Sequence, residues 1–212
     1  MCSQICASKN DVVDLLTKLK IIPCPHCKKT GFLIKHGSLL GYGLNQMGST
    51  VRGARAVRVY CSNRNHSIGC GRTFSVWTAD KINHLFLSAD SLWQFLNDAV
   101  SSGNKLQAFR NLKSGLSDSA AYHIWRRFLN AQVAIRTALT ALCGQPQVES
   151  DCPAKLTLKH LAKAFHGHKL SPIAAFAATL QTFFIRLPGG SVVLFESVLH
   201  GPLLNGPVPS PA

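Results

Sequence analysis

Two pairs of cysteines constrain this chain more than any other feature of its sequence. The segment CPHC contains Cys24 and Cys27, and the segment CSNRNHSIGC contains Cys61 and Cys70. A single CxxC suits a redox pair, half of a disulfide or half of a metal site. A second pair favours the metal site, because zinc binds four thiolates in a tetrahedron with a zinc–sulfur distance of about 2.3 Å. The sequence therefore predicts one zinc ion bound by these four cysteines.

The residues around both pairs fit metal-binding loops. Gly31 follows the first pair and supplies the positive φ that such loops need. Gly69 and Gly71 flank Cys70 in the second loop, and the β-branched and aromatic residues of 57–60 lead into it. Such residues favour strands. We expect two hairpins that present the cysteines, and so a small β zinc ribbon.

The second pair leaves alternatives open, because its spacing is C-x8-C rather than C-x2-C. His66 lies inside this loop and can replace Cys70 as a ligand, and His26 lies inside the first loop. A further alternative is a set of buried free cysteines without a metal. A thioredoxin-like redox pair is disfavoured, because no βαβ pattern surrounds CPHC.

The distribution of charge points to a polyanionic partner. Lys and Arg total 23 against nine Asp and Glu, a net charge of +14. Residues 15–79 contain no acid, although lysines and arginines recur throughout them. Such a segment favours binding to nucleic acid phosphates. The arginines that we expect to contact DNA from this segment are Arg52, Arg55, Arg58, Arg64 and Arg72.

Residues 80–142 contain the pattern of three helices. Ser88 is the N-cap expected for the first, and Gly103 ends it. Asn104 caps a shorter second helix, and Gly115 is expected to be left-handed in the next turn. Ser117 is the expected cap of the third. A short helix, a turn of three to four residues and a longer helix form a helix-turn-helix. An ordinary three-helix bundle without groove contacts is the alternative.

The third helix separates an apolar face from a polar one. Its apolar stripe consists of Ile124, Phe128, Ala131, Ile135, Leu139 and Leu142, at steps of three and four residues. Polar and basic residues of its first turns leave that stripe. Those that we expect to contact DNA are Ser119, Tyr122, His123, Arg126 and Arg127.

The expected fold is α+β and mainly α. Its parts are an N-terminal helix (1–19), the zinc ribbon (20–79), the helix-turn-helix unit (80–142), a C-terminal helical region containing a hairpin (143–199) and a disordered tail (200–212). The polar start MCSQICAS resembles no secretory signal, and the longest apolar run, from Leu170, is too short to span a membrane. We therefore expect a cytoplasmic protein with no membrane partner.

Two longer segments add a family resemblance. CPHC with VRGARAVRVYCSNRNHSIGCGRTFSVW, followed by AFRNLKSGLSDSAAYHIWRRF, resembles the DNA-binding portion of bacterial insertion-sequence transposases. In that family a zinc ribbon precedes a helix-turn-helix that binds the terminal repeats of the element. The resemblance covers about residues 20–130. It implies zinc on Cys24, Cys27, Cys61 and Cys70, and it implies that the helix from Asp118 enters the major groove.

The same resemblance leads us to expect no enzyme. The catalytic half of such transposases uses three carboxylates that bind two metal ions. After Leu142 this chain has only Glu149, Asp151 and Glu196. We expect an accessory, regulatory or remnant product that binds double-stranded DNA, with a catalytic transposase or a second copy of the chain as further partners. The alternative is a zinc-stabilised adaptor whose helical half binds protein.

Overall fold

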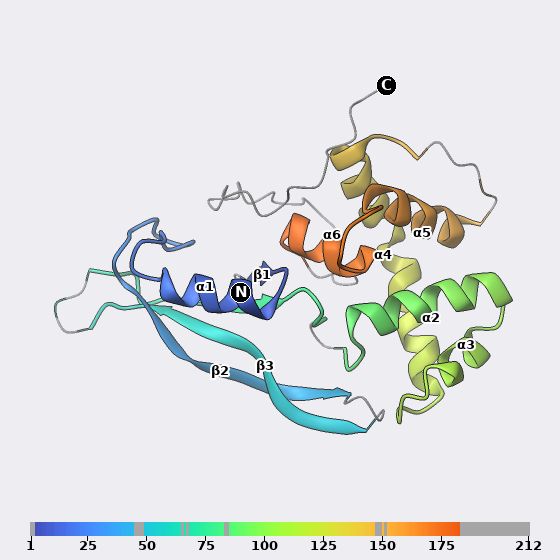
Figure 1. Cartoon of the computed structure of the whole chain (residues 1–212), viewed down its shortest axis with the longest axis horizontal. Coiled ribbons are helices and arrows are strands. Elements are labelled where there is room, and N and C mark those ends of the chain that lie inside the picture. Colours follow the sequence, from blue (N-terminus) through green and yellow to red (C-terminus); the bar gives the residue numbers. More distant parts are fainter. Residues whose placement is uncertain are drawn as a thin grey trace.

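The computed structural model describes residues 3–44, 49–64, 66, 68–82, 85–146, 150 and 152–182. Figure 1 shows a sheet with one helix on one side of the molecule and the remaining helices on the other. The expected α+β class, with more helix than strand and an N-terminal β region, is confirmed. Within the described residues, no helix combines the length and the apolar character that crossing a membrane requires.

The sheet contains four strands in the order β1-β4-β3-β2. Their bounds are Ser3–Cys6 (β1), Leu33–Leu44 (β2), Thr50–Cys61 (β3) and Thr73–Thr78 (β4). β2, β3 and β4 pair antiparallel, whereas β1 pairs parallel to β4. A single helix was expected over residues 1–19, so β1 is a correction. Its four residues carry no readable pattern, and pairing with a strand far along the chain determines their conformation.

The first helix, α1 (Lys9–Thr17), covers one face of the sheet. Ser8 caps it in a reciprocal capping box, in which the Asp11 N–H donates to Ser8 Oγ and the Ser8 N–H donates to Asp11 Oδ2. Val12 and Leu15 of α1 are buried in one cluster with Val59, Cys24 and Cys61. The cysteines therefore lie at the edge of a small apolar core.

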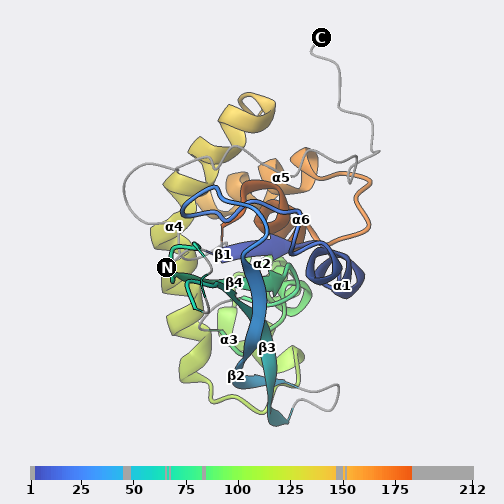
Figure 2. The same cartoon turned by 90° about the vertical axis from the view of Figure 1, so that its left-hand side faces the viewer.

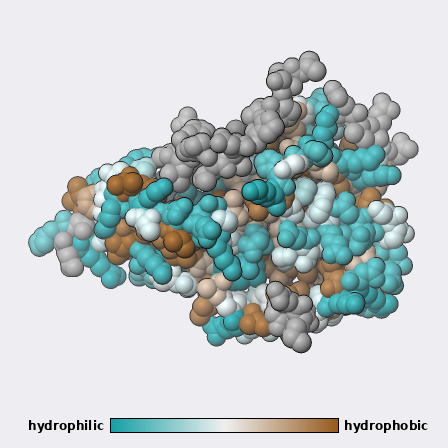
Figure 3. Space-filling model, in the orientation of Figure 1, coloured by the Kyte–Doolittle hydropathy of each residue, from teal (hydrophilic) through white to brown (hydrophobic). Residues whose placement is uncertain are grey.

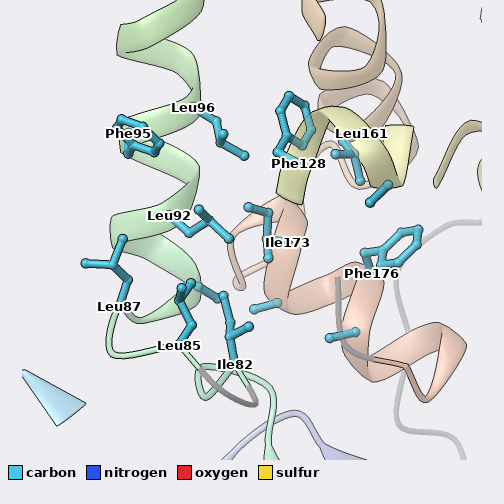
Figure 4. Packing of buried hydrophobic residues seen from close by; sticks show 14 of the residues in the cluster. Ile82, Leu85, Leu87, Leu92, Phe95, Leu96, Phe128, Leu161, Ile173 and Phe176 are labelled. Atoms are coloured by element: carbon cyan, nitrogen blue, oxygen red, sulfur yellow. The ribbon is translucent and has the colours of Figure 1, made fainter. Parts of the chain in front are cut away.

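The other face of the sheet joins the core of the helical half. Ile5 and Trp77 belong to this second, larger cluster. The helices that build it are α2 (Ala89–Ser102), α3 (Lys105–Asn111), α4 (Ser119–Cys143), α5 (Pro153–Ala164) and α6 (Pro172–Leu180). In Figure 4, Leu92 of α2 points toward Ile173 of α6, close to Phe128 of α4. α4 therefore has its own apolar anchor, independent of the cysteines.

The first two helix starts match their predicted caps, and the third does not. Ser88 and Asn104 each accept a backbone N–H three residues along, and Gly103 ends α2 at φ 68°. In the next turn Lys113, with φ 49°, is left-handed in place of Gly115. The residue before α4 is Asp118 rather than Ser117, and it makes no side-chain capping bond.

An ion pair explains why Asp118 does not cap α4. Arg110 Nη2 lies 2.5 Å from Asp118 Oδ2, and Arg110 Nε donates to the same carboxylate. The carboxylate therefore faces α3 rather than the first N–H groups of α4. The connection runs from residue 112 to residue 118, longer than the three to four residues expected of this motif.

The C-terminal hairpin is linked to the N-terminal strand by one side chain. Gln181, which follows α6, accepts the Ile5 N–H at 2.8 Å and donates to the Ile5 carbonyl at 2.8 Å. This amide pairs with the outer edge of β1 as a further strand would. Residues 183–212, with Glu196 and the expected tail, lie outside the described residues, as do Glu149 and Asp151.

Candidate metal centre and nucleic-acid interface

The structure brings Cys24, Cys27, Cys61 and Cys70 together, with all four sulfur atoms within 4.8 Å of one another. The Cys24–Cys70 and Cys27–Cys61 sulfur distances are both 3.8 Å. A tetrahedron of sulfurs about 2.3 Å from a central zinc ion has edges of about 3.8 Å. A disulfide needs sulfurs about 2.05 Å apart. The donor set and its spacing therefore fit a tetrahedral metal ion.

Backbone hydrogen bonds shape the first loop. The Lys28 N–H donates to the Cys24 carbonyl at 2.8 Å, and the Cys24 N–H donates to the Lys29 carbonyl at 2.9 Å. Lys28 has φ 61°, so the chain turns back immediately after Cys27. The His26 N–H lies 3.4 Å from Cys24 Sγ and can donate to it. This amide favours a thiolate at Cys24.

The second loop uses the same kind of contact despite its greater length. The Gly71 N–H donates to the Cys61 carbonyl at 2.9 Å, and the Cys70 N–H donates to Cys61 Sγ at 3.3 Å. Gly69 is so tightly packed that a Cβ there would lie 2.1 Å from the Ser62 carbonyl oxygen and 2.8 Å from Cys61 Sγ. The greater length of this loop therefore does not move Cys70 away from the other sulfurs.

Neither histidine alternative belongs to this group. His66 is exposed with φ 62°, and the four cysteines form the cluster without it. The His26 ring lies against the Thr73 carbonyl, with Nε2 3.4 Å from that oxygen. Among the described residues, the four cysteines are the only group of three or more histidine, cysteine or acidic residues arranged to hold a metal.

The sulfurs differ in their protonation without a cation. Burial raises the pKa of the Cys61 thiol to about 12, and burial also raises the pKa of Cys24. The backbone N–H of Lys29 lowers the pKa of Cys27 to about 7. A thiolate at Cys24 or Cys61 is therefore favoured by a nearby cation, which is what a bound divalent metal supplies.

The candidate DNA contacts of α4 share one surface. Ser119, Tyr122, His123 and Arg126 are exposed on its first two turns, and Arg127 is half-buried. Lys105 of α3 places its Nζ 5.4 Å from the centre of the Tyr122 ring, in a cation–π contact. The stripe on the opposite side of α4 is buried as predicted, except that Leu142 is 44% exposed. The polar side of α4 therefore faces solvent at its N-terminal end.

A hollow of about 320 Å³ lies beside this surface. Its polar lining includes Ser119, His123 and Arg127, and Phe86 and Leu116 form part of its apolar lining. The half-buried Arg127 therefore lines the hollow together with two of the exposed residues of α4. Three of the five candidate contacts on α4 therefore line a concave site, whereas Tyr122 and Arg126 lie outside its lining.

The structure does not gather the arginines of the ribbon into one patch. Arg52 is exposed near the start of β3, Arg58 is half-buried, and Arg64 and Arg72 are exposed near the cysteines. Arg55 differs from all of them. Its guanidinium donates to the backbone carbonyls of Tyr42, Ile82 and Leu85 at 2.8, 3.0 and 2.9 Å. We therefore withdraw Arg55 as a phosphate contact, because its donors are bound within the protein.

One cluster near the cysteines was missed in the sequence. The Tyr60 ring lies 5.4 Å from the His36 ring and 5.7 Å from the Arg64 guanidinium carbon. His36 reaches Tyr60 because the pairing of β2 with β3 shifts between Lys35 and Gly37. No local pattern in the sequence predicts this bulge. The cluster places Arg64 and an imidazole together beside the metal centre.

Comparison with models of protein families, with curated proteins and with solved structures finds no match for this chain. The metal centre and the surface of α4 are therefore interpreted from their own geometry.

Proposed function

We propose that this protein binds double-stranded DNA, with the N-terminal half of α4 in the major groove and a structural zinc ion on the four cysteines. The observation that carries the proposal is the exposed set of Tyr122, His123 and Arg126 on a helix whose opposite face is buried. A helix of this kind fits the major groove, where side chains read the edges of bases. The net charge of +14 supplies the attraction to phosphates.

The sulfur geometry supports zinc in particular. Thiolates are soft ligands, and a set of four cysteines with tetrahedral spacing is typical of structural zinc sites. Such a closed set leaves no position for a substrate. We therefore assign the metal to folding and not to chemistry.

Arg52, Arg58, Arg64 and Arg72 remain the proposed phosphate contacts of the ribbon, without Arg55. Contacts to phosphates position a protein on DNA but carry little sequence information. We propose that the chain acts without a nuclease centre of its own, as an accessory, regulatory or remnant product. Its further partner would be a catalytic transposase or a second copy of the chain.

One observation favours the adaptor as a second candidate. Leu129 and Val133 of α4 are 44% and 68% exposed. Between Leu129 and Cys143 only Arg136 carries a charge, and it donates to Thr157 of α5 at 2.9 Å. An exposed helix face without charges suits a protein partner. A protein partner would therefore bind the C-terminal half of α4, whereas DNA would bind its N-terminal half.

His123→Ala tests the reading of bases by α4. On a duplex selected from a random pool, the variant should relax the preference at one base pair and lose about 1–3 kcal/mol of binding free energy. Lys159→Ala is the matched control, because it removes an exposed basic residue from α5, away from the proposed surface. A wild-type protein that selects no duplex, or equal selection by the wild type and His123→Ala, would contradict this assignment.

Arg64→Ala tests the phosphate contacts separately. It should weaken binding to all duplexes alike and reduce the slope of log affinity against log salt by about one. The measurement is fluorescence anisotropy with a labelled duplex over a series of salt concentrations. Wild-type affinity that does not change with salt would favour the adaptor instead.

A further inference from the structure

The β2–β3 hairpin extends beyond the rest of the sheet. β4 pairs with β3 only from Ala56 to Tyr60, whereas β2 pairs with β3 as far as Leu44 opposite Thr50. We call residues 40–44 and 50–54 the arm. Among the residues that the structure describes, the arm is thus a two-stranded ribbon without a third strand on either side. Two-stranded ribbons are marginally stable alone, so contacts elsewhere must hold the arm.

Arg55 provides that support on one face of the arm. Its side chain lies across Gly41 and Gly43. A Cβ at Gly41 would lie 3.0 Å from Arg55 Cγ, and one at Gly43 would lie 2.7 Å from Arg55 Nη1. Beyond the glycines, the guanidinium reaches the carbonyls of Ile82 and Leu85. The two glycines therefore make room for a side chain that ties the arm to the segment before α2.

A bulge gives Arg55 this position. The pairing passes from Leu39 opposite Ala56 to Leu40 opposite Ala54, so Arg55 has no partner on β2. An unpaired residue of this kind bends its strand and redirects its side chain. Leu39 and Leu44 also pack against the helical core. The arm is therefore fixed to the helical half at several points.

The opposite face of the arm is largely exposed at Leu40 and Tyr42, whereas Leu44, which lies on the same face by the alternation of side chains, packs against the helical core. Side chains alternate between faces along a strand, so Leu40 and Tyr42 point away from the glycines. They are 61% and 55% exposed, and Tyr42 lies directly opposite the exposed Arg52. Figure 3 shows apolar and polar side chains next to one another along this arm. The outer face thus combines apolar groups with a cation and has no acid near it in the sequence.

The arm ends beside the proposed DNA-reading end of α4. Figures 1 and 2 both place the end of the β2–β3 ribbon at the same end of the molecule as the connection between α3 and α4. The cysteines lie at the other end of β3, at Cys61. β3 has 12 residues, and the steps between them, at about 3.3 Å each, separate the two ends by roughly 36 Å. The arm, rather than the metal centre, is the neighbour of α4.

We propose that the outer face of the arm inserts Tyr42, Leu40 and Arg52 into the minor groove next to the major groove that α4 occupies. The inference rests on the proposed binding of duplex DNA. Arginine with apolar side chains is the combination that proteins place in minor grooves, where the arginine meets strong negative potential and the apolar groups contact base steps. Arg55 is then a positioning residue, which holds the arm at the level of α4.

The test compares Tyr42→Ala and Arg52→Ala with Arg72→Ala, which removes an exposed arginine near the cysteines. The wild-type footprint on the selected duplex should extend beyond the bases read by α4 into one flanking minor groove. The arm variants should lose that extension and about tenfold in affinity, while the bases preferred by α4 stay unchanged. Arg72→Ala should lose affinity but keep the full footprint.

Base substitution identifies the groove. In the flank, inosine–cytosine pairs lack the guanine N2 amino group, so their minor groove is nearly the same as that of A·T pairs. Their major groove differs from that of A·T pairs. Wild-type protein should bind inosine–cytosine and A·T flanks equally and G·C flanks less tightly. The arm variants should not distinguish these three duplexes. A preference that separates inosine–cytosine from A·T would overturn the minor-groove assignment.

The outcomes separate the two proposals. No binding of any duplex by wild-type protein overturns the proposed function, and the arm with it. Sequence-selective binding with identical footprints for wild type and the arm variants overturns the arm alone. Sedimentation of the proteins without DNA tests whether a second copy of the chain binds this face instead. If Tyr42→Ala dissociates a dimer and leaves the footprint intact, the arm binds a second copy of the chain and not DNA.

Discussion

Cys61→Ser is expected to abolish stoichiometric zinc binding and to unfold the metal end of the sheet. Cys61 is fully buried, and its sulfur accepts the Cys70 N–H and lies 3.8 Å from Cys27 Sγ. Structural zinc contributes apparent binding free energies of about 10–16 kcal/mol in small zinc-folded peptides. Losing a ligand therefore costs more than losing one apolar side chain. The helical half should persist, because α4 and its neighbours share a core that includes none of the four cysteines.

The measurement is the zinc content of the purified protein by elemental analysis, together with thermal unfolding followed by circular dichroism. Cys152→Ser is the matched control, since Cys152 is an exposed cysteine outside the metal cluster. The control should retain one zinc ion and the wild-type transition. Chelation of wild-type protein should reproduce the Cys61→Ser behaviour. Full zinc content in Cys61→Ser, or a wild type without zinc, would refute the metal site.

The features that the sequence predicted well are those set by neighbouring residues. Ser88 and Asn104 cap their helices because each side chain needs only an N–H three residues away. The sequence indicates the two cysteine pairs for a similar reason, because each pair lies in a loop that is closed by hydrogen bonds of its own backbone. The metal cluster needed one further assumption, that the two loops meet. The antiparallel pairing of β2, β3 and β4 brings them together.

The features that the sequence did not predict depend on distant partners. β1 is a strand because it pairs with β4, and Gln181 reaches it from the far end of the chain. Nothing in the sequence distinguishes Arg55 from its neighbouring arginines. In the structure a bulge redirects its side chain, and its guanidinium donates to a carbonyl of the segment before α2. In the turn after α3 the left-handed residue is Lys113 and not the expected Gly115, and the Lys113 N–H donates to the Arg110 carbonyl at 3.0 Å.

Gly69→Ala should weaken zinc binding without touching a ligand. The added Cβ would lie 2.1 Å from the Ser62 carbonyl oxygen, a backbone atom, and 2.8 Å from Cys61 Sγ. Neither atom can retreat freely, since the same carbonyl accepts the Gly69 N–H at 2.9 Å. Overpacking of this kind costs about 1–3 kcal/mol. If the strain falls on the metal-bound loop, zinc affinity drops by about 10- to 100-fold, measured by competition with a chromophoric chelator.

Gly53→Ala is the control for this substitution. Gly53 also lies in the basic N-terminal half, but a Cβ there would meet no atom within 4 Å, and its φ is not in the left-handed region. Alanine at such a site is neutral or slightly stabilising, because it reduces the freedom of the unfolded chain. The two variants add the same methyl group, so a difference in their zinc affinities would come from the tight packing of the loop that holds Cys61 and Cys70. Equal zinc affinities would mean that this loop is looser than its contacts imply, and that the tetrahedral spacing of the sulfurs does not depend on Gly69.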